Sequence, residues 1–339
     1  MSQTLPAVPA HELAIQTDDE RWLIRSVWGL SAVGMIAGSA KSYKTWTGLE
    51  LAFSVATGLP FLGKFPVEQR GRALVYLAED ALPLVRGRIE SLCVHRKFDI
   101  RALDLFVITV PELRLDLAGH QEKLRQTVAH LKPRLLLLDP LVRLHRLDEN
   151  NATEMSGLLG YLRALQRELD VAIVLAHHVS KRARPQQGQA MRGTSDLHAW
   201  TDCAAYLAWQ NKQLHLTLEH RAAKPPPPIV IDLVSGPEGD AAHLEVLEEG
   251  VVRSGDESTP TLSLATKLYR LIWNSAKPIS RTELRGLLKV NNEKLGALLA
   301  NLEHHGRIRR TPQGWVPTSR PEAAVRKAGE TQQGRLPLM

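Results

Sequence analysis

Short apolar runs alternate with amphipathic stretches along the first two thirds of the chain. The runs at residues 32–37, 73–77, 106–110, 134–138 and 171–176 have the length and residue types of β-strands. The last two are almost continuously apolar, which is typical of parallel strands that helices cover on both faces. The pattern therefore predicts an α/β fold with a mainly parallel, doubly wound sheet covered by helices.

Helical spacing fills the intervals near the start of the chain. A helix over residues 44–57 is expected to end at Gly58. A second helix is expected over residues 81–97, with Asp80 as its N-cap because a short carboxylate can accept bonds from the first free N–H groups. Strands and helices therefore alternate, as a parallel sheet requires.

The later part of the chain changes character twice. Residues 214–218 and 229–233 predict a β pair, and the polar stretch 254–260 marks a domain boundary. Beyond it, helical spacing over 262–274, 280–288 and 292–305, followed by a hairpin around Gln313-Gly314, predicts a winged helix. The predicted organisation is a flexible N-terminus (1–20), a large α/β domain (21–253), a linker (254–260), a winged-helix domain (261–317) and a disordered tail (318–339).

The net charge of +7 is unevenly distributed. Residues 261–339 contain 14 Lys and Arg against 5 Glu and no Asp, so the chain totals of 43 and 36 leave 29 against 31 for residues 1–260. All the excess positive charge lies in the last quarter. This asymmetry indicates an acidic partner for that segment, most simply nucleic acid; a basic, solvated surface is the alternative.

Composition argues against two other classes of protein. Cys93 and Cys203 are too few and too far apart for a disulfide framework or a Cys-rich zinc site, which fits a reducing, cytoplasmic compartment. The longest apolar run, around residues 135–142, is far shorter than the roughly 20 residues that span a bilayer. The first 20 residues lack the apolar segment of a signal peptide. We therefore expect no membrane contact and no export.

A phosphate-binding loop is predicted between the first strand and the first helix, because backbone N–H groups at a helix N-terminus cradle phosphates. Lys44 is expected to reach the β- and γ-phosphates of ATP, and Thr45 to offer its hydroxyl to Mg²⁺. Lys41 adds a second positive charge. The predicted nucleotide-binding residues are Gly38, Ser39, Ala40, Lys41, Ser42, Tyr43, Lys44 and Thr45.

Tyr43 departs from the usual pattern of this loop. It stands where a second glycine normally lets the backbone approach the nucleotide. We expect Tyr43 to be accommodated if its φ is helical and its ring points away. An imperfect loop of this kind can also arise by coincidence, so the neighbouring strands must supply further support.

Two other strand ends carry carboxylates. Asp139 follows the apolar run at 135–138 and suits a water-mediated magnesium ligand. Glu79 follows the run at 73–77 and is expected to polarise the attacking water. Either acid alone would indicate no more than an ordinary strand-end carboxylate. Their joint occurrence, in this order, predicts an ATPase.

Three further segments carry a resemblance to a known family. Residues 139–145 read Asp-Pro-Leu-Val-Arg-Leu-His, residues 148–152 read Asp-Glu-Asn-Asn-Ala, and residues 174–181 read Val-Leu-Ala-His-His-Val-Ser-Lys. From about Trp28 to Leu233 the chain resembles the plasmid-encoded RepA-type hexameric replicative helicases, which belong to the RecA-like and DnaB-like ATPases. Tyr43 and the added winged helix depart from that family. The resemblance therefore supports ATPase chemistry more strongly than strand separation.

The resemblance implies roles for residues beyond the phosphate loop. His178 would be the sensor of the γ-phosphate, while the alternative for His177 and His178 is a pair of strand-end histidines with satisfied hydrogen bonds. The loop that follows would face a central channel and grip single-stranded DNA. Its basic residues are Arg182, Arg184 and Arg192. A solvated loop with incidental charge is the alternative.

Arg221 and Lys224, after a later strand, resemble the basic residues that reach into the nucleotide site of a neighbouring subunit. Such residues stabilise transition-state charge only in a ring or filament. An ordinary surface pair is the alternative.

In the predicted winged helix, two groups of residues are candidates for DNA contact. Asn291, Asn292 and Lys294 begin the third helix, the end that normally points into a major groove. The predicted wing carries Arg307, Arg309 and Arg310, which suit phosphate contacts. Winged helices also serve as protein docking modules or lids, but the charge asymmetry favours DNA.

These features together predict a cytoplasmic, DNA-dependent ATPase that uses ATP and Mg²⁺ and forms a homo-oligomeric ring, a hexamer by resemblance, as in the RepA-type helicases of plasmids or phages. One alternative is a nucleotide-controlled regulator or assembly switch that binds DNA without translocation. A recombination or repair ATPase is the third alternative.

Overall fold

The computed structural model describes residues 7–13, 15, 17, 20–149, 151–178, 195–235, 241–247, 264–275, 277–304 and 306–318. The chain divides into two compact units, residues 1–236 with 241–256 and residues 237–240 with 257–339. The larger unit carries the phosphate loop. The smaller unit has its own elements and core.

A nine-stranded sheet forms the centre of the larger unit, in the order β11-β10-β9-β8-β3-β7-β6-β4-β5. Strands β3 to β8 pair in parallel with one another, whereas β9, β10 and β11 continue the sheet with antiparallel pairs. The predicted α/β class with a mainly parallel sheet is confirmed. The strands are β3 (Val33–Gly38), β4 (Ala73–Leu77), β5 (Leu105–Val107), β6 (Leu135–Asp139), β7 (Ala172–His178), β8 (Cys203–Gln210), β9 (Gln213–His220), β10 (Ile229–Val234) and β11 (His243–Leu247).

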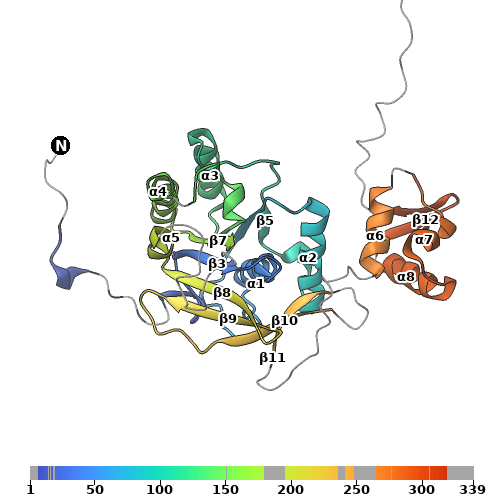
Figure 1. Cartoon of the computed structure of the whole chain (residues 1–339), viewed down its shortest axis with the longest axis horizontal. Coiled ribbons are helices and arrows are strands. Elements are labelled where there is room, and N and C mark those ends of the chain that lie inside the picture. Colours follow the sequence, from blue (N-terminus) through green and yellow to red (C-terminus); the bar gives the residue numbers. More distant parts are fainter. Residues whose placement is uncertain are drawn as a thin grey trace, which may run out of the picture. The chain divides into compact units, whose positions relative to one another are not determined.

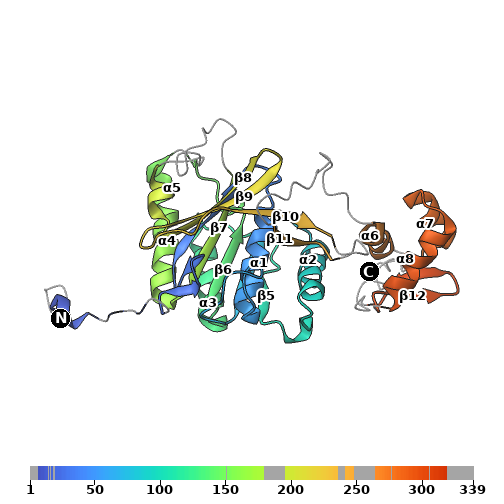
Figure 2. The ribbon, with the colours of Figure 1, turned by 90° about the horizontal axis from the view of Figure 1, so that it is seen from below.

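Helices cover both faces of this sheet. Figure 1 shows α1 (Lys44–Thr57) and α2 (Leu82–His95) on one side and α3 (Ala118–Leu131), α4 (Ala152–Leu169) and α5 (Ser195–Trp200) on the other, and Figure 2 shows the same layers from below. Short 3-10 helices span Ala10–Glu12, Ile100–Ala102 and Leu141–Arg143.

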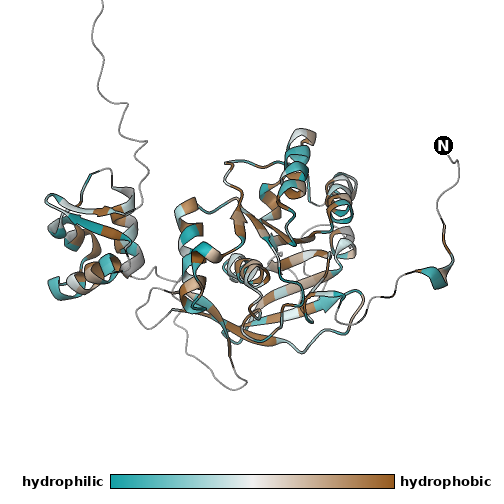
Figure 3. Cartoon of the chain, turned by 180° about the vertical axis from the view of Figure 1, so that it is seen from behind, coloured by the Kyte–Doolittle hydropathy of each residue, from teal (hydrophilic) through white to brown (hydrophobic). Residues whose placement is uncertain are grey.

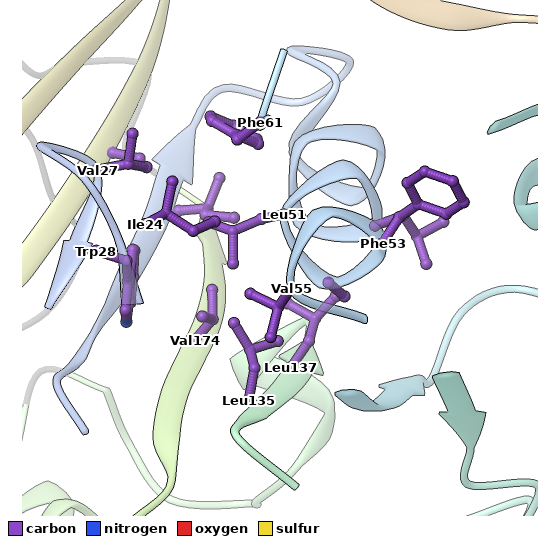
Figure 4. Close-up of a cluster of buried hydrophobic side chains, with 14 of the residues drawn as sticks. Ile24, Val27, Trp28, Leu51, Phe53, Val55, Phe61, Leu135, Leu137 and Val174 are labelled. Carbon is purple, nitrogen blue, oxygen red and sulfur yellow. The ribbon is translucent and has the colours of Figure 1, made fainter. Parts of the chain in front are cut away.

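Strand β6 explains why both faces need cover. Its side chains alternate, so Leu135 and Leu137 enter the core under α1 while Leu136 and Leu138 enter the core under α4. In Figure 4, Leu51 and Val55 of α1 lie among Leu135, Leu137 and Val174. Figure 3 shows the hydrophobic residues concentrated on the strands and on the inner sides of the helices.

A small antiparallel ribbon of β1 (Trp22–Ile24) and β2 (Trp28–Gly29) packs against the core under α1. Trp28 is fully buried, and its indole N–H donates to the carbonyl oxygen of Ala32 at 3.3 Å. Close packing between β3 and β8 depends on Gly34, because a Cβ there would lie 1.9 Å from the carbonyl oxygen of Cys203.

One prediction about α2 is wrong. The helix begins at Leu82, and its N-cap is Ala81, which makes no side-chain cap bond. Pro83 stands in the first turn instead, where its missing N–H costs nothing and its fixed φ suits a helix. Asp80 is therefore not a helix cap, and its carboxylate is ion-paired with Arg88.

The smaller unit contains three helices and a two-stranded hairpin. They are α6 (Leu264–Asn274), α7 (Arg281–Leu288), α8 (Asn292–His304), β12 (Ile308–Thr311) and β13 (Gly314–Pro317). Ile279 pairs with Trp315 of the hairpin. The side chains of Leu268, Leu284 and Leu299, one from each helix, meet Trp315 in a separate buried core. Ser280 and Glu283 form a capping box at the start of α7.

Candidate nucleotide site

Four parallel strands end at one edge of the sheet, and each end carries a predicted functional residue. Gly38 at the end of β3 lies opposite His178 at the end of β7. Leu77 at the end of β4, two residues before Glu79, lies opposite Asp139 at the end of β6. Since β6 pairs with β7, these ends are contiguous, and ligands of open α/β sheets bind at such an edge.

The phosphate loop folds tightly between β3 and α1. A Cβ at Gly38 would lie 2.4 Å from the hydroxyl oxygen of Ser42 and 2.8 Å from the carbonyl oxygen of Leu207, so only glycine fits there. The Ser42 hydroxyl donates to the carbonyl oxygen of Ser39 at 2.9 Å. These contacts set the curve of the loop ahead of the helix.

Lys44 begins α1 and is buried within this loop. Its ammonium donates to the carbonyl oxygens of Gly38 at 3.0 Å and Ser39 at 2.7 Å. Burial lowers the pKa of Lys44, while the negative charges of Asp139 and Glu79 oppose that shift. Both carboxylates therefore lie close enough to act on the lysine that the sequence predicts to bind phosphate.

The backbone of Tyr43 differs from the expectation. Its φ is 58° and its ψ is 29°, so the residue is left-handed and not helical. This is the conformation that glycine supplies at no steric cost, and a side chain there costs roughly 1–2 kcal/mol. The tyrosine ring packs edge-on against Trp209, with 5.9 Å between ring centroids, which helps to offset the strain.

Asp139 and Thr45 form the part of the site that fits a cation. Asp139 is 6% exposed, and burial raises its pKa to about 6, although a hydrogen bond with the Thr45 side chain and the charge of Lys44 act in the opposite direction. Its Oδ2 is buried with no hydrogen-bond partner in the described part of the chain. An unsatisfied carboxylate oxygen beside a hydroxyl suits a hard, oxygen-seeking ion, so these residues fit Mg²⁺.

Two arginines that the sequence did not single out bind the acids of the β4 end. Arg143 Nε lies 2.7 Å from Glu79 Oε1, and Arg88 is ion-paired with Asp80. The Arg88 guanidinium also lies over the ring of Trp46, 5.6 Å from its centroid. Arg143 belongs to the motif at residues 139–145. Its place in that motif is the only feature of the sequence that connects Arg143 with the site.

The predicted sensor and its neighbour differ in burial. His177 is buried within the sheet, whereas His178 is half-buried at the end of β7. His178 pairs with Gly38, the residue at which the phosphate loop begins, and His177 has the burial of a core residue.

The other predicted residues do not join this edge. Arg221 donates to the carbonyl oxygen of Ala199 and lies 3.3 Å from Asp202, which precedes β8. Because β8 is parallel to β3, Asp202 lies at the amino edge, opposite the phosphate loop. Lys224 is exposed. Arg182, Arg184 and Arg192 lie outside the described residues.

In the smaller unit, a polar hollow of about 350 Å³ is lined by Arg281, Thr282, Arg285 and Asn292. Arg281 donates to the carbonyl oxygen of Asn292 at 2.8 Å, which ties α7 to α8. The side chains of Asn292, Lys294, Arg309 and Arg310 are exposed, whereas Arg307 is half-buried with its guanidinium 5.9 Å from the ring centroid of Tyr269.

Within the described residues, no group of three or more His, Cys, Asp or Glu side chains could hold a metal ion on its own. The same part of the chain contains no helix long and apolar enough to cross a membrane.

The sheet order and this edge define a P-loop ATPase core of the RecA-like fold, in which one strand, β7, separates the phosphate-loop strand from the strand of Asp139. Residues 2–184 match the family model described as an AAA domain, which is more than half of the 339 residues. The chain therefore belongs to this family of P-loop ATPases. Among solved structures, an ATPase domain is similar at 14% identity, with a TM-score of 0.47 over 64% of this chain and 85% of that chain.

Proposed function

We propose that the protein is a DNA-dependent ATPase that acts as a ring-forming homo-oligomer, as RepA-type replicative helicases do. The convergence of the phosphate loop, Asp139 and Glu79 at one sheet edge supports ATP hydrolysis. DNA dependence and ring formation are proposed from the resemblance of residues 139–152 and 174–181 to the helicase family. Lys44 would bind the β- and γ-phosphates, and Thr45 with Asp139 would hold Mg²⁺, directly or through water. Bound Mg²⁺ would neutralise charge on the phosphates as the terminal one leaves.

Glu79 would polarise the water that attacks the γ-phosphate. One carboxylate oxygen binds Arg143, and a carboxylate has lone pairs left on both oxygens to accept from a water. His178 would sense the γ-phosphate from the neighbouring strand end. Its position opposite Gly38 supports this role, because Gly38 begins the loop that would hold the phosphates.

Arg221 and Lys224 would act on the site of a neighbouring subunit. The contact of Arg221 with Asp202 at the amino edge argues against any action of this arginine on its own phosphate loop. Catalysis with an arginine finger would therefore need a ring or filament, and a hexameric ring is the proposed state. The proposed ring would hold single-stranded DNA in a central channel through Arg182, Arg184 and Arg192.

The smaller unit would serve as a winged helix that contacts duplex DNA. The exposed residues Asn292 and Lys294 at the start of α8 would approach bases, and the arginines of the hairpin would approach phosphates. The basic hollow between α7 and α8 adds to the positive surface.

Steady-state ATP hydrolysis, with and without single-stranded DNA, tests the proposal. Single strands should stimulate the wild type, Glu79→Gln should lower turnover by about 10²–10⁴-fold as expected for loss of a general base, and Glu90→Gln in α2 should match the wild type. Retained turnover in Lys44→Ala would refute the phosphate site. Hydrolysis that DNA does not stimulate would favour the alternative function, a nucleotide-controlled assembly switch.

A further inference from the structure

Glu79 and Arg143 form an ion pair across two neighbouring strand ends. The Nε–Oε1 distance is 2.7 Å, and the residues are 64 positions apart in the chain. The two loops that carry them are joined by a backbone bond, in which the Ala78 N–H donates to the carbonyl oxygen of Asp139 at 2.8 Å. The pair therefore lies at the point where the proposed catalytic base and the proposed metal ligand meet.

Arg143 extends from a rigid part of the backbone. It ends the 3-10 turn Leu141–Arg143, and the flanking side chains of Leu141 and Leu144 are fully buried. The Arg143 N–H donates to the carbonyl oxygen of Pro140 at 3.1 Å, and the Leu144 N–H donates to the carbonyl oxygen of Leu141 at 2.9 Å. The guanidinium is thus anchored at its base, although its tip is exposed.

The side chain of Glu79 is held in place by few contacts. Its side chain is 48% exposed, and in the described residues the one hydrogen bond assigned to its carboxylate comes from Arg143. An unrestrained glutamate samples many rotamers, and fixing one costs conformational entropy. A general base must lie within hydrogen-bond reach of its water, so this freedom would lower the fraction of productive geometries.

We propose that Arg143 is a positioning residue for ATP hydrolysis. Its bond to Oε1 fixes the carboxylate of Glu79, so that Oε2 is oriented to accept a hydrogen bond from the attacking water. The inference rests on the proposed function, because it assigns Arg143 a role only if Glu79 is the base. In this role Arg143 would act through Glu79, without contact of its own with the nucleotide or the water. The opposite interpretation, in which Arg143 restrains Glu79 and slows hydrolysis, predicts the opposite sign of the effect.

The same loop offers a matched control. Arg146 is more exposed than Arg143, with 75% of its side chain accessible, and lies 3.7 Å from Glu112 in a second surface ion pair. Its substitution removes the same charge from the same loop without touching Glu79. A general electrostatic effect of the loop would therefore change with either arginine, whereas positioning requires Arg143 alone.

The test compares wild type, Arg143→Ala, Arg143→Lys and Arg146→Ala in steady-state ATP hydrolysis. Loss of the restraint on one side chain should lower kcat of Arg143→Ala by about five- to ten-fold, with KM for ATP within about two-fold of wild type. Arg143→Lys should recover part of the loss, because an ammonium can still bind one carboxylate oxygen. Arg146→Ala should match the wild type, as should the thermal unfolding midpoint of Arg143→Ala.

A double-mutant cycle with Glu79→Gln separates positioning from other roles, with turnover measured under single-turnover conditions. If Arg143 acts through Glu79, adding Arg143→Ala to Glu79→Gln should change nothing further. An equal loss in both backgrounds, a rise in turnover of Arg143→Ala, or no change at all would each overturn the proposal. Full activity of Glu79→Gln, by contrast, would refute the assignment of the base and hence the proposed function.

Discussion

Replacing Asp139 by asparagine should stabilise the protein while it abolishes hydrolysis. Burial holds the pKa of Asp139 at about 6, above its ordinary value of 3.8. An acid whose pKa is raised on folding contributes most to stability below its unfolded pKa, and that contribution is lost as the pH rises through the folded pKa. At neutral pH the folded state therefore carries an unfavourable buried charge.

The magnitude follows from linkage. A shift from 3.8 to about 6 corresponds to about 3 kcal/mol over the whole titration, of which about 1 kcal/mol falls between pH 5 and pH 7.5. The asparagine side chain has the same shape but no charge, so the Asp139→Asn variant should gain stability relative to wild type as the pH rises. Glu50, another buried acid whose pKa is raised by burial, titrates in both proteins and cancels in the comparison.

The assay is urea unfolding at pH 5 and pH 7.5, with a chelator and without nucleotide, so that no ligand stabilises the folded state. Unfolding of the smaller unit is an internal control, because Asp139 belongs to the larger unit. Parallel pH profiles for the two proteins, or a less stable Asp139→Asn variant at pH 7.5, would refute the reasoning. Hydrolysis should be lost in either case, since the proposed metal ligand is gone.

Two other predictions test the assembly and the smaller unit. Arg221→Ala subunits mixed with Glu79→Gln subunits should hydrolyse ATP more slowly than wild-type subunits mixed with Glu79→Gln subunits, if Arg221 acts on the neighbouring site. Equal turnover of the two mixtures would remove that role. A chain truncated after Pro260 should bind duplex DNA more weakly, with a shallower dependence of log affinity on log salt because phosphate contacts are lost; equal binding across a salt titration would contradict the charge argument.

Local patterns were sufficient for the framework of the site. The helix Lys44–Thr57 and the strand Ala73–Leu77 have the bounds that apolar spacing predicted, and the strand Leu135–Asp139 begins and ends one residue later than expected. Such segments are readable because burial on both faces demands continuous apolar residues. The same pattern was enough to place Asp139 and Glu79 at or just beyond the ends of their strands.

Local patterns were insufficient to predict the contacts of a side chain that has more than one possible partner. Asp80 had the right residue type for a helix cap, but Arg88 competes for its carboxylate and Pro83 sets the first turn. At Tyr43, the helical φ expected from the sequence gives way to a left-handed one, because the loop must close around Lys44 and Trp209 supplies a packing surface. Neither competitor is visible from spacing alone.

The fold class and the phosphate loop could be predicted from the amino-acid sequence, since both depend on residues within about ten positions of one another and on the periodicity of burial. The contact between Arg143 and Glu79 could not. It joins residues 64 positions apart, and it exists because β4 lies beside β6 in the sheet. Strand order is set by how all the strands and helices pack together, so the partners of a strand-end side chain follow from the packed fold.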